Sequence, residues 1–343
     1  MSVLFSRVLV SRFLYVPSQG TNYVTAFSID RSSGRLSQIQ TIGSFPGTPN
    51  GSCLDPDRNY YFVGEQTGTG PIHPFAIDQR TGMLSIRTPL TQSFGSNPQS
   101  CVVVGSTVYV AVSIATNNVF LHSITSSGTL QAMGLVSTGA LGLSESSAEP
   151  AGEFVYFSDS GNSVFVFRVG ANGALTAGTG SPLVLAGAPS SLSFSGNRVY
   201  VANGSGNVAG YTRASNGQLT LIAGSSQATG AAPTNTAIDP GGRFLYVVNN
   251  GGASLSGYVI SSSGTLTPVS GSPFATSANP NGIAMDAGGQ YVYVSHASGT
   301  VGVFAINQST GQLTNTQSIS GGSTPTDVAI VNVMVNSYLG GLD

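Results

Sequence analysis

The chain has no lysine, no tryptophan and little charge of either sign. All 11 basic side chains among its 343 residues are arginines, 13 side chains are acidic, and charged residues make up 7% of the sequence, against about 25% in ordinary globular domains. Binding through nucleic-acid phosphates needs a dense cationic surface, so we expect no nucleic-acid partner. The apolar fraction of 40% is enough to bury a core, which excludes a disordered chain.

Long apolar runs and cofactor motifs are also missing. No run of 18 apolar residues predicts a transmembrane helix, and the apolar residues 1–10 lack the form of a signal peptide. Phosphate-binding loops, dinucleotide fingerprints and HExxH are absent, and the three histidines are scattered, so we expect no cofactor and no metal. Cys53 and Cys101 form no metal-ligand spacing, and the sequence leaves open whether they pair.

What the sequence does contain is a sevenfold repeat. A Gly-x-Leu mark recurs every 44 to 48 residues, and an aromatic residue in a β-branched run precedes each mark. The glycines are Gly34, Gly82, Gly128, Gly173, Gly217, Gly264 and Gly311, and the aromatics are Tyr15, Phe62, Tyr109, Tyr156, Tyr200, Tyr246 and Tyr293. Each repeat holds four short alternating runs separated by turn residues, which predicts four antiparallel strands with a positive-φ glycine in one turn.

Four strands in about 46 residues are typical of one propeller blade. The chain begins with a second-type strand and ends with an unpaired first-type strand at 324–331, so the two ends complete one blade and close the ring. We therefore predict an all-β, seven-bladed β-propeller of four-stranded antiparallel blades over residues 12–331. An apolar N-terminal strand extension, 1–11, and a C-terminal extension, 332–343, flank it.

The two extensions allow two arrangements. They extend the closing blade by pairing with each other, or one of them adds a strand to a second copy of the chain. The scarcity of charge favours self-association into a homo-oligomer or filament. The residues expected to mediate assembly are Val3, Leu4, Phe5, Val8, Leu9, Val10, Val333, Met334, Val335 and Tyr338.

The motif DPGGRFLYV at 239–247, together with the seven Gly-x-Leu marks, resembles the lactonase-type seven-bladed propellers, which include 6-phosphogluconolactonase-like proteins. The resemblance covers residues 12–331 and implies the same fold. It also implies that enzymatic members carry histidine, arginine and glutamate at the channel mouth, where lactone hydrolysis needs a base for water and a cation for an anionic group.

The sequence departs from that pattern at the predicted channel wall. The position after the proline of each first strand holds a neutral polar residue rather than histidine, in the series Asn50, Gln99, Ser190, Thr234, Asn281 and Thr326. Such a lining can bind sugar hydroxyls but supplies little general base. The remaining catalytic candidates are His296, Glu65 and Asp327. His122 is predicted to pack in the core, His73 to lie on the surface, and Glu145 and Glu149 to be solvated or hydrogen-bonded in loops.

The missing histidine leads us to expect a non-catalytic structural or binding propeller, extracellular or at the cell surface, that self-assembles through its terminal strands. One alternative is a lactone hydrolase acting on a sugar-derived lactone, with His296, Glu65 or Asp327 as its base. Another is a propeller that binds carbohydrate without turnover. The cytoplasm is the alternative location.

Overall fold

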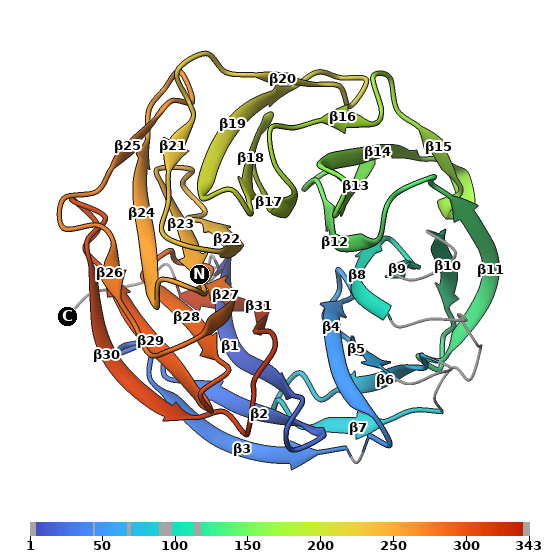
Figure 1. Ribbon diagram of the computed structural model, residues 1–343. Coiled ribbons are helices and arrows are strands. Elements are labelled where there is room, and N and C mark those ends of the chain that lie inside the picture. The colour runs from blue at the N-terminus through green and yellow to red at the C-terminus, as the bar shows by residue number, and fades with distance from the viewer. Residues whose placement is uncertain (1–4, 44, 67–69, 89–97, 113–117, 339–343) are drawn as a thin grey trace.

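The computed structural model describes residues 5–43, 45–66, 70–88, 98–112 and 118–338, and these form seven antiparallel sheets arranged as blades around a ring (Figure 1). The only helical element in these ranges is a short 3-10 turn, Ala171–Gly173. The predicted all-β, seven-bladed propeller is confirmed.

Each blade has four strand positions, counted outward from the ring axis, and in blades 4 to 6 the outermost position is split into two short pieces. Blade 1 contains β31 (Ala329–Tyr338), β1 (Phe5–Ser18), β2 (Tyr23–Ile29) and β3 (Leu36–Ile42). Blade 2 contains β4 (Thr48–Leu54), β5 (Tyr60–Gln66), β6 (Ile72–Ile77) and β7 (Leu84–Ile86). Blade 3 contains β8 (Pro98–Val104), β9 (Thr107–Val112), β10 (Asn118–Ile124) and β11 (Leu130–Ser137).

The remaining blades follow in chain order. Blade 4 contains β12 (Leu143–Ala148), β13 (Phe154–Asp159), β14 (Ser163–Val169), β15 (Leu175–Ala177) and β16 (Leu183–Val184). Blade 5 contains β17 (Pro189–Ser195), β18 (Arg198–Asn203), β19 (Asn207–Arg213), β20 (Leu219–Leu221) and β21 (Gln227–Ala228). Blade 6 contains β22 (Pro233–Ile238), β23 (Phe244–Asn249), β24 (Ser254–Ile260), β25 (Leu266–Pro268) and β26 (Phe274–Ala275). Blade 7 contains β27 (Pro280–Met285), β28 (Tyr291–His296), β29 (Thr300–Ile306) and β30 (Leu313–Ser320).

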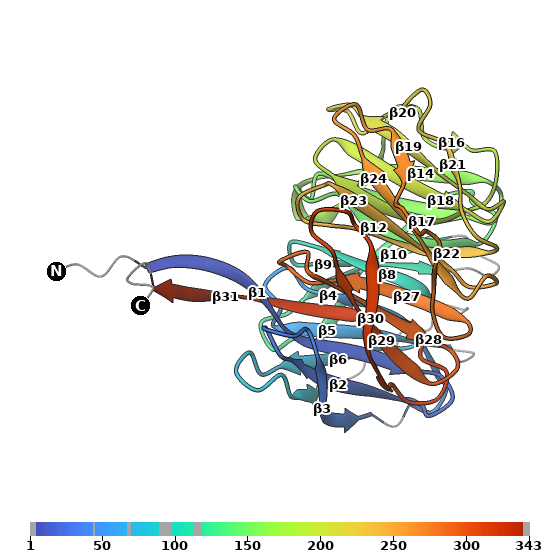
Figure 2. The same cartoon turned by 90° about the vertical axis from the view of Figure 1, so that its left-hand side faces the viewer.

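The chain ends meet in blade 1. β1 pairs antiparallel with β31 from Tyr15 opposite Ala329 outward to Phe5 opposite Tyr338. Beyond the ring the two strands continue as a ribbon that projects from one face of the propeller (Figure 2). The extensions therefore pair with each other, which is the first of the two predicted arrangements.

The residues expected to mediate assembly differ in their surroundings. On the ribbon, Val8, Leu9 and Met334 are exposed by 41%, 48% and 51%, while Val10 is buried and Val333 is half-buried. In the backbone register, Val8 lies opposite Val335 and Phe5 opposite Tyr338. Val3 and Leu4 lie outside the described residues.

The two sequence marks meet at the interfaces between blades. In six of the seven blades, the second-strand tyrosine donates its hydroxyl hydrogen to the carbonyl of the marker glycine in the following blade, over 2.7 to 3.4 Å. The pairs are Tyr15–Gly82, Tyr109–Gly173, Tyr156–Gly217, Tyr200–Gly264, Tyr246–Gly311 and Tyr293–Gly34. All seven marker glycines have φ between +68° and +88°, which confirms the predicted positive-φ turn.

Candidate functional site

The innermost strands of the blades surround the ring axis (Figure 1). Several of them share an irregularity near their first residues. The pairing register shifts between Asn50 and Ser52 in β4, between Pro98 and Ser100 in β8, and between Pro233 and Asn235 in β22. A bulge of this kind turns side chains away from the regular alternation. It follows the proline that opens each strand, so the polar residues after that proline can point toward the axis.

These polar residues surround a cavity of about 200 Å³ in the channel. The cavity is lined by Asn50, Gly51, Ser52, Gln99, Ser100, Cys101, Ser144, Glu145, Thr234, Asn235, Asn281, Thr326 and Asp327. Five of the six residues predicted to line the channel are in this group. Ser190, in β17, is not among the residues around the cavity.

Two carboxylates face the cavity from different blades. Glu145 lies on β12, and Asp327 lies just before β31. The Asp327 carboxylate accepts hydrogen bonds from the Ser52 hydroxyl at 2.6 Å and from the Val328 backbone N–H at 2.7 Å. Both residues are half-buried and line the cavity.

The surroundings of Glu145 and Asp327 affect the pKa values of these two carboxyl groups differently. Burial, followed by the negative charge of Asp327, raises the pKa of Glu145 to about 8. Burial also raises the pKa of Asp327, but the Ser52 hydroxyl and backbone N–H groups stabilise its ionised form and oppose that rise. At neutral pH the Glu145 carboxyl group is therefore largely protonated. The hydrogen bonds to Asp327 favour the ionised form of that group, which burial disfavours.

The sequence signals for these two residues were unequal. Asp327 lies within the proline-opened first strand predicted at 324–331 and is one of the catalytic candidates. The strand that carries Glu145 departs from the proline pattern, so the sequence predicts only a solvated or hydrogen-bonded loop role for Glu145. The structure instead places Glu145 on the wall of the cavity, where it is the one acidic residue of blade 4 among the described lining residues.

The other two catalytic candidates lie one strand behind the channel wall. His296 ends β28 opposite Pro280, is fully buried, and its Nε2 lies 2.5 Å from the Thr276 hydroxyl. Burial lowers the pKa of this imidazole. Since His296 does not line the cavity, its contacts are those of a packed side chain.

Glu65 holds the beginning of the neighbouring inner strand. It lies on β5 opposite Pro49, is 1% exposed, contacts His73 Nε2 at 2.5 Å and accepts the backbone N–H of Gly47. His73 is half-buried against the edge of Phe45, so its predicted place on the surface was wrong. Pairing with Glu65 draws it inward. His122 is buried in β10, where burial lowers its pKa to about 4.

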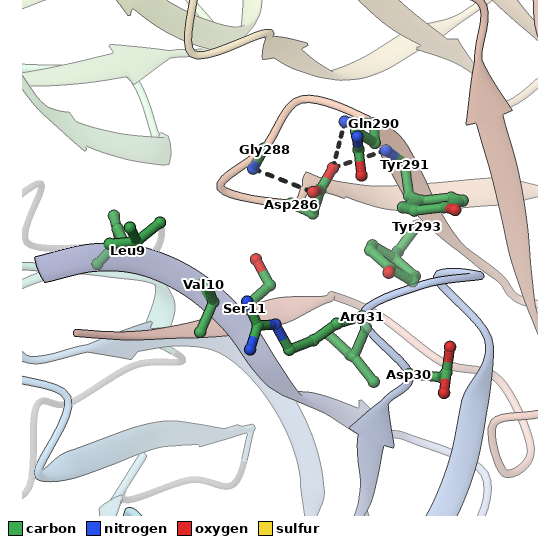
Figure 3. A pocket seen from close by; sticks show the side chains of 12 residues that line it. Leu9, Val10, Ser11, Asp30, Arg31, Asp286, Gly288, Gln290, Tyr291 and Tyr293 are labelled. Atoms are coloured by element: carbon green, nitrogen blue, oxygen red, sulfur yellow. Dashed lines mark hydrogen bonds between the residues drawn. The ribbon is translucent and has the colours of Figure 1, made fainter. Parts of the chain in front are cut away.

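A second pocket, also of about 200 Å³, lies at the base of the terminal ribbon (Figure 3). Its two carboxylates, Asp286 and Asp30, already accept hydrogen bonds from the backbone. The Asp286 carboxylate accepts the backbone N–H groups of Gly288, Gln290 and Tyr291, and Asp30 accepts those of Ser32 and Ser33. The carboxylates of this pocket are therefore less available to a ligand than those of the channel cavity.

Cys53 of β4 and Cys101 of β8 form a disulfide between blades 2 and 3, with their Cα atoms 5.6 Å apart. Cys101 is also part of the cavity wall. The pairing that the sequence left open is thus present beside the candidate site. Among the described residues, no group of three or more His, Cys, Asp and Glu side chains is arranged to hold a metal ion.

Comparison with known proteins identifies the family of this chain. The family described as "Lactonase, 7-bladed beta-propeller" matches residues 5–104 and 223–330. A protein of Bacteroides fragilis named as a candidate 6-phosphogluconolactonase superposes with a TM-score of 0.84 at 19% identity, covering 94% of this chain and 98% of that one. The periplasmic gluconolactonase PpgL of Pseudomonas aeruginosa gives 0.83 at 20% identity, with 94% and 99% covered.

These two structures are similar in fold. A comparison with curated protein sequences gave no match. Within the described residues, no helix is long and apolar enough to cross a membrane.

Proposed function

Because this chain belongs to the family of seven-bladed β-propeller lactonases, we propose that it hydrolyses a lactone in its central channel. The family match overturns the expectation of a non-catalytic, self-assembling structural propeller. That expectation rested on the missing histidine, but a carboxylate can also serve as the base that activates water. The observation that carries the proposal is the pair of carboxylates, Glu145 and Asp327, in one polar cavity.

The proposed reaction uses the two carboxylates in different protonation states. Ionised Asp327 removes a proton from a water molecule, whose oxygen attacks the lactone carbonyl carbon. The tetrahedral intermediate then breaks the ring C–O bond, and protonated Glu145 donates its proton to the leaving ring oxygen. The product is an open-chain hydroxy acid, and proton exchange with solvent restores both carboxyl groups.

The neutral lining would position the substrate and stabilise the transition state. Side-chain amides of Asn50, Gln99 and Asn281 are N–H donors on the cavity wall. Donors of this kind stabilise the negative charge that develops on the carbonyl oxygen. The Ser52 hydroxyl, bonded to Asp327, would orient the base.

The disulfide supports a location for this activity. A Cys53–Cys101 bond is stable in oxidising surroundings and rare in the cytosol. We therefore propose that the protein works in the periplasm or outside the cell.

Asp327→Asn tests the proposed base. We expect the variant to lower kcat/KM for glucono-δ-lactone by roughly 100-fold or more, because the amide cannot accept the proton of water. Proton release in weak buffer measures the rate. Asp55→Asn is the matched control, since Asp55 is a buried carboxylate in a turn that holds the Tyr60 N–H, away from the cavity. A wild-type rate equal to that of buffer would refute the activity, and an active Asp327→Asn would refute the role of this residue.

A further inference from the structure

The cavity has a one-sided charge. Among the described residues that line it, the two ionisable ones are both acids, Glu145 and Asp327, and none is an arginine or a histidine. Three of the described arginines have partners outside the cavity. Arg213 pairs with Glu149 at 3.5 Å, Arg243 pairs with Asp239 at 3.0 Å, and Arg58 donates to the Asp55 carbonyl. The potential inside the channel is therefore negative whenever Asp327 is ionised.

An anionic group on the substrate would be repelled by this negative charge, and no cationic side chain among the described lining residues would offset the repulsion. A phosphate monoester carries nearly two negative charges at neutral pH, and proteins bind it with arginine, lysine, helix N-termini or backbone nests. The described residues contain no α-helix that could supply an N-terminus. In an enclosed cavity the repulsion between like charges is stronger than in water.

The rest of the lining suits a neutral polyol. Apart from Gly51, Cys101 and the two acids, every lining residue is Asn, Gln, Ser or Thr. Amides and hydroxyls both donate and accept hydrogen bonds, which matches successive sugar hydroxyls. An alkyl or aromatic substituent would find no apolar wall, and burying polar groups against it without partners is costly.

We infer that the channel selects uncharged, hydroxyl-rich lactones and rejects lactones that carry a phosphate or a carboxylate. This substrate class rests on the proposed lactone hydrolysis. The selectivity comes from the net negative cavity, in which Asp327 both activates water and repels an anionic substituent.

Two substrates with the same ring test this inference. We expect the kcat/KM of the wild-type protein to be at least about 100-fold higher for glucono-δ-lactone than for its 6-phosphate. Equal or preferential turnover of the phosphorylated lactone would overturn the selectivity and leave the lactonase activity standing. Turnover of neither substrate would instead refute the proposed function.

Adding a cation to the wall tests the physical cause. Gln99→Arg should reduce the preference for the neutral lactone at least about tenfold, because the guanidinium offsets the negative cavity. Gln99→Met keeps the side chain long but neutral and should leave the preference unchanged. If Gln99→Arg does not fold, Asn281→Arg repeats the test from a different blade, because Asn281 lies on β27 and Gln99 on β8. An unchanged preference in a folded arginine variant would overturn the electrostatic explanation.

Discussion

At the scale of single residues, the environment of each ionisable group decides what it can do. His296 and Glu65 have reactive side chains, but they are buried one strand behind the channel and bonded to neighbours. Glu145 and Asp327 are ordinary acids that become distinctive because the ring encloses them together. The candidate site is therefore a pair of carboxylates and not a histidine.

The raised pKa of Glu145 predicts the sign of a stability change with pH. Its pKa rises from an ordinary value of 4.5 to about 8 in the folded protein. Between these values the folded state binds more protons than the unfolded state, so this group lowers the free energy of unfolding as pH rises from about 4.5 to about 8. Above that pH its effect is constant.

Glu145→Gln should remove this contribution. We expect the loss of stability between pH 5 and pH 8 to be smaller in the variant by on the order of 2 kcal/mol. Urea unfolding of both proteins at the two pH values measures the difference. Asp55 and Asp286, whose pKa values are also raised, remain in both proteins and cancel. Asp327 interacts with Glu145, so its contribution is part of the measured difference. An identical pH dependence would contradict the prediction.

At the scale of elements, each blade is fastened to the next by the same contact. The second-strand tyrosine reaches the marker glycine of the following blade, and the series includes Tyr293 to Gly34 across the ring closure. Blade 2 differs because Phe62 has no hydroxyl. There the ring of Tyr60 lies where a Cβ on Gly128 would be, and the Tyr60 hydroxyl donates to the Ser126 carbonyl at 3.3 Å.

Tyr246→Phe should lower the free energy of unfolding by about 1 kcal/mol, because the buried Gly311 carbonyl loses its donor at 2.7 Å. Tyr60→Phe is the control, since it removes an exposed and longer hydrogen bond and should cost about 0.5 kcal/mol or less. Chemical denaturation gives both values. Equal losses in the two variants would show that burial of the inter-blade bond is not what stabilises the interface.

At the scale of the whole molecule, the ring is held by two long-range closures. The terminal strands β1 and β31 join the ends of the chain within blade 1. The Cys53–Cys101 disulfide joins two inner strands that are 48 residues apart in sequence. Both closures act at the channel wall, where the candidate site is formed.

Loss of the disulfide should lower the free energy of unfolding by about 4 kcal/mol, since it frees a 48-residue loop in the unfolded chain. Thermal unfolding with and without a reductant tests this. The double variant Cys53→Ala with Cys101→Ala serves as the control, because a reductant should not change its melting temperature. A wild-type melting temperature that does not respond to complete reduction would contradict the prediction.

The architecture can be predicted from the sequence alone, because blade structure is local and periodic. Alternating runs define the strands, Gly-x-Leu marks define positive-φ turns such as that at Gly34, and the prolines before Asn50 and Gln99 place polar residues at the channel wall. The chain begins with a second-type strand and ends with an unpaired first-type strand, and this pattern also predicts ring closure in blade 1. These features depend on residues within one repeat or on counting repeats.

The contacts between repeats become visible only in the folded ring. It brought Glu145 beside the lumen with Asp327, paired Cys53 with Cys101, and buried His296 behind the wall. The strand that carries Glu145 lacks the proline of the other first strands, so the repeat pattern does not predict that Glu145 lines the cavity. The pKa of a carboxylate depends on the groups that enclose it, and in a propeller those groups come from blades far apart in the chain.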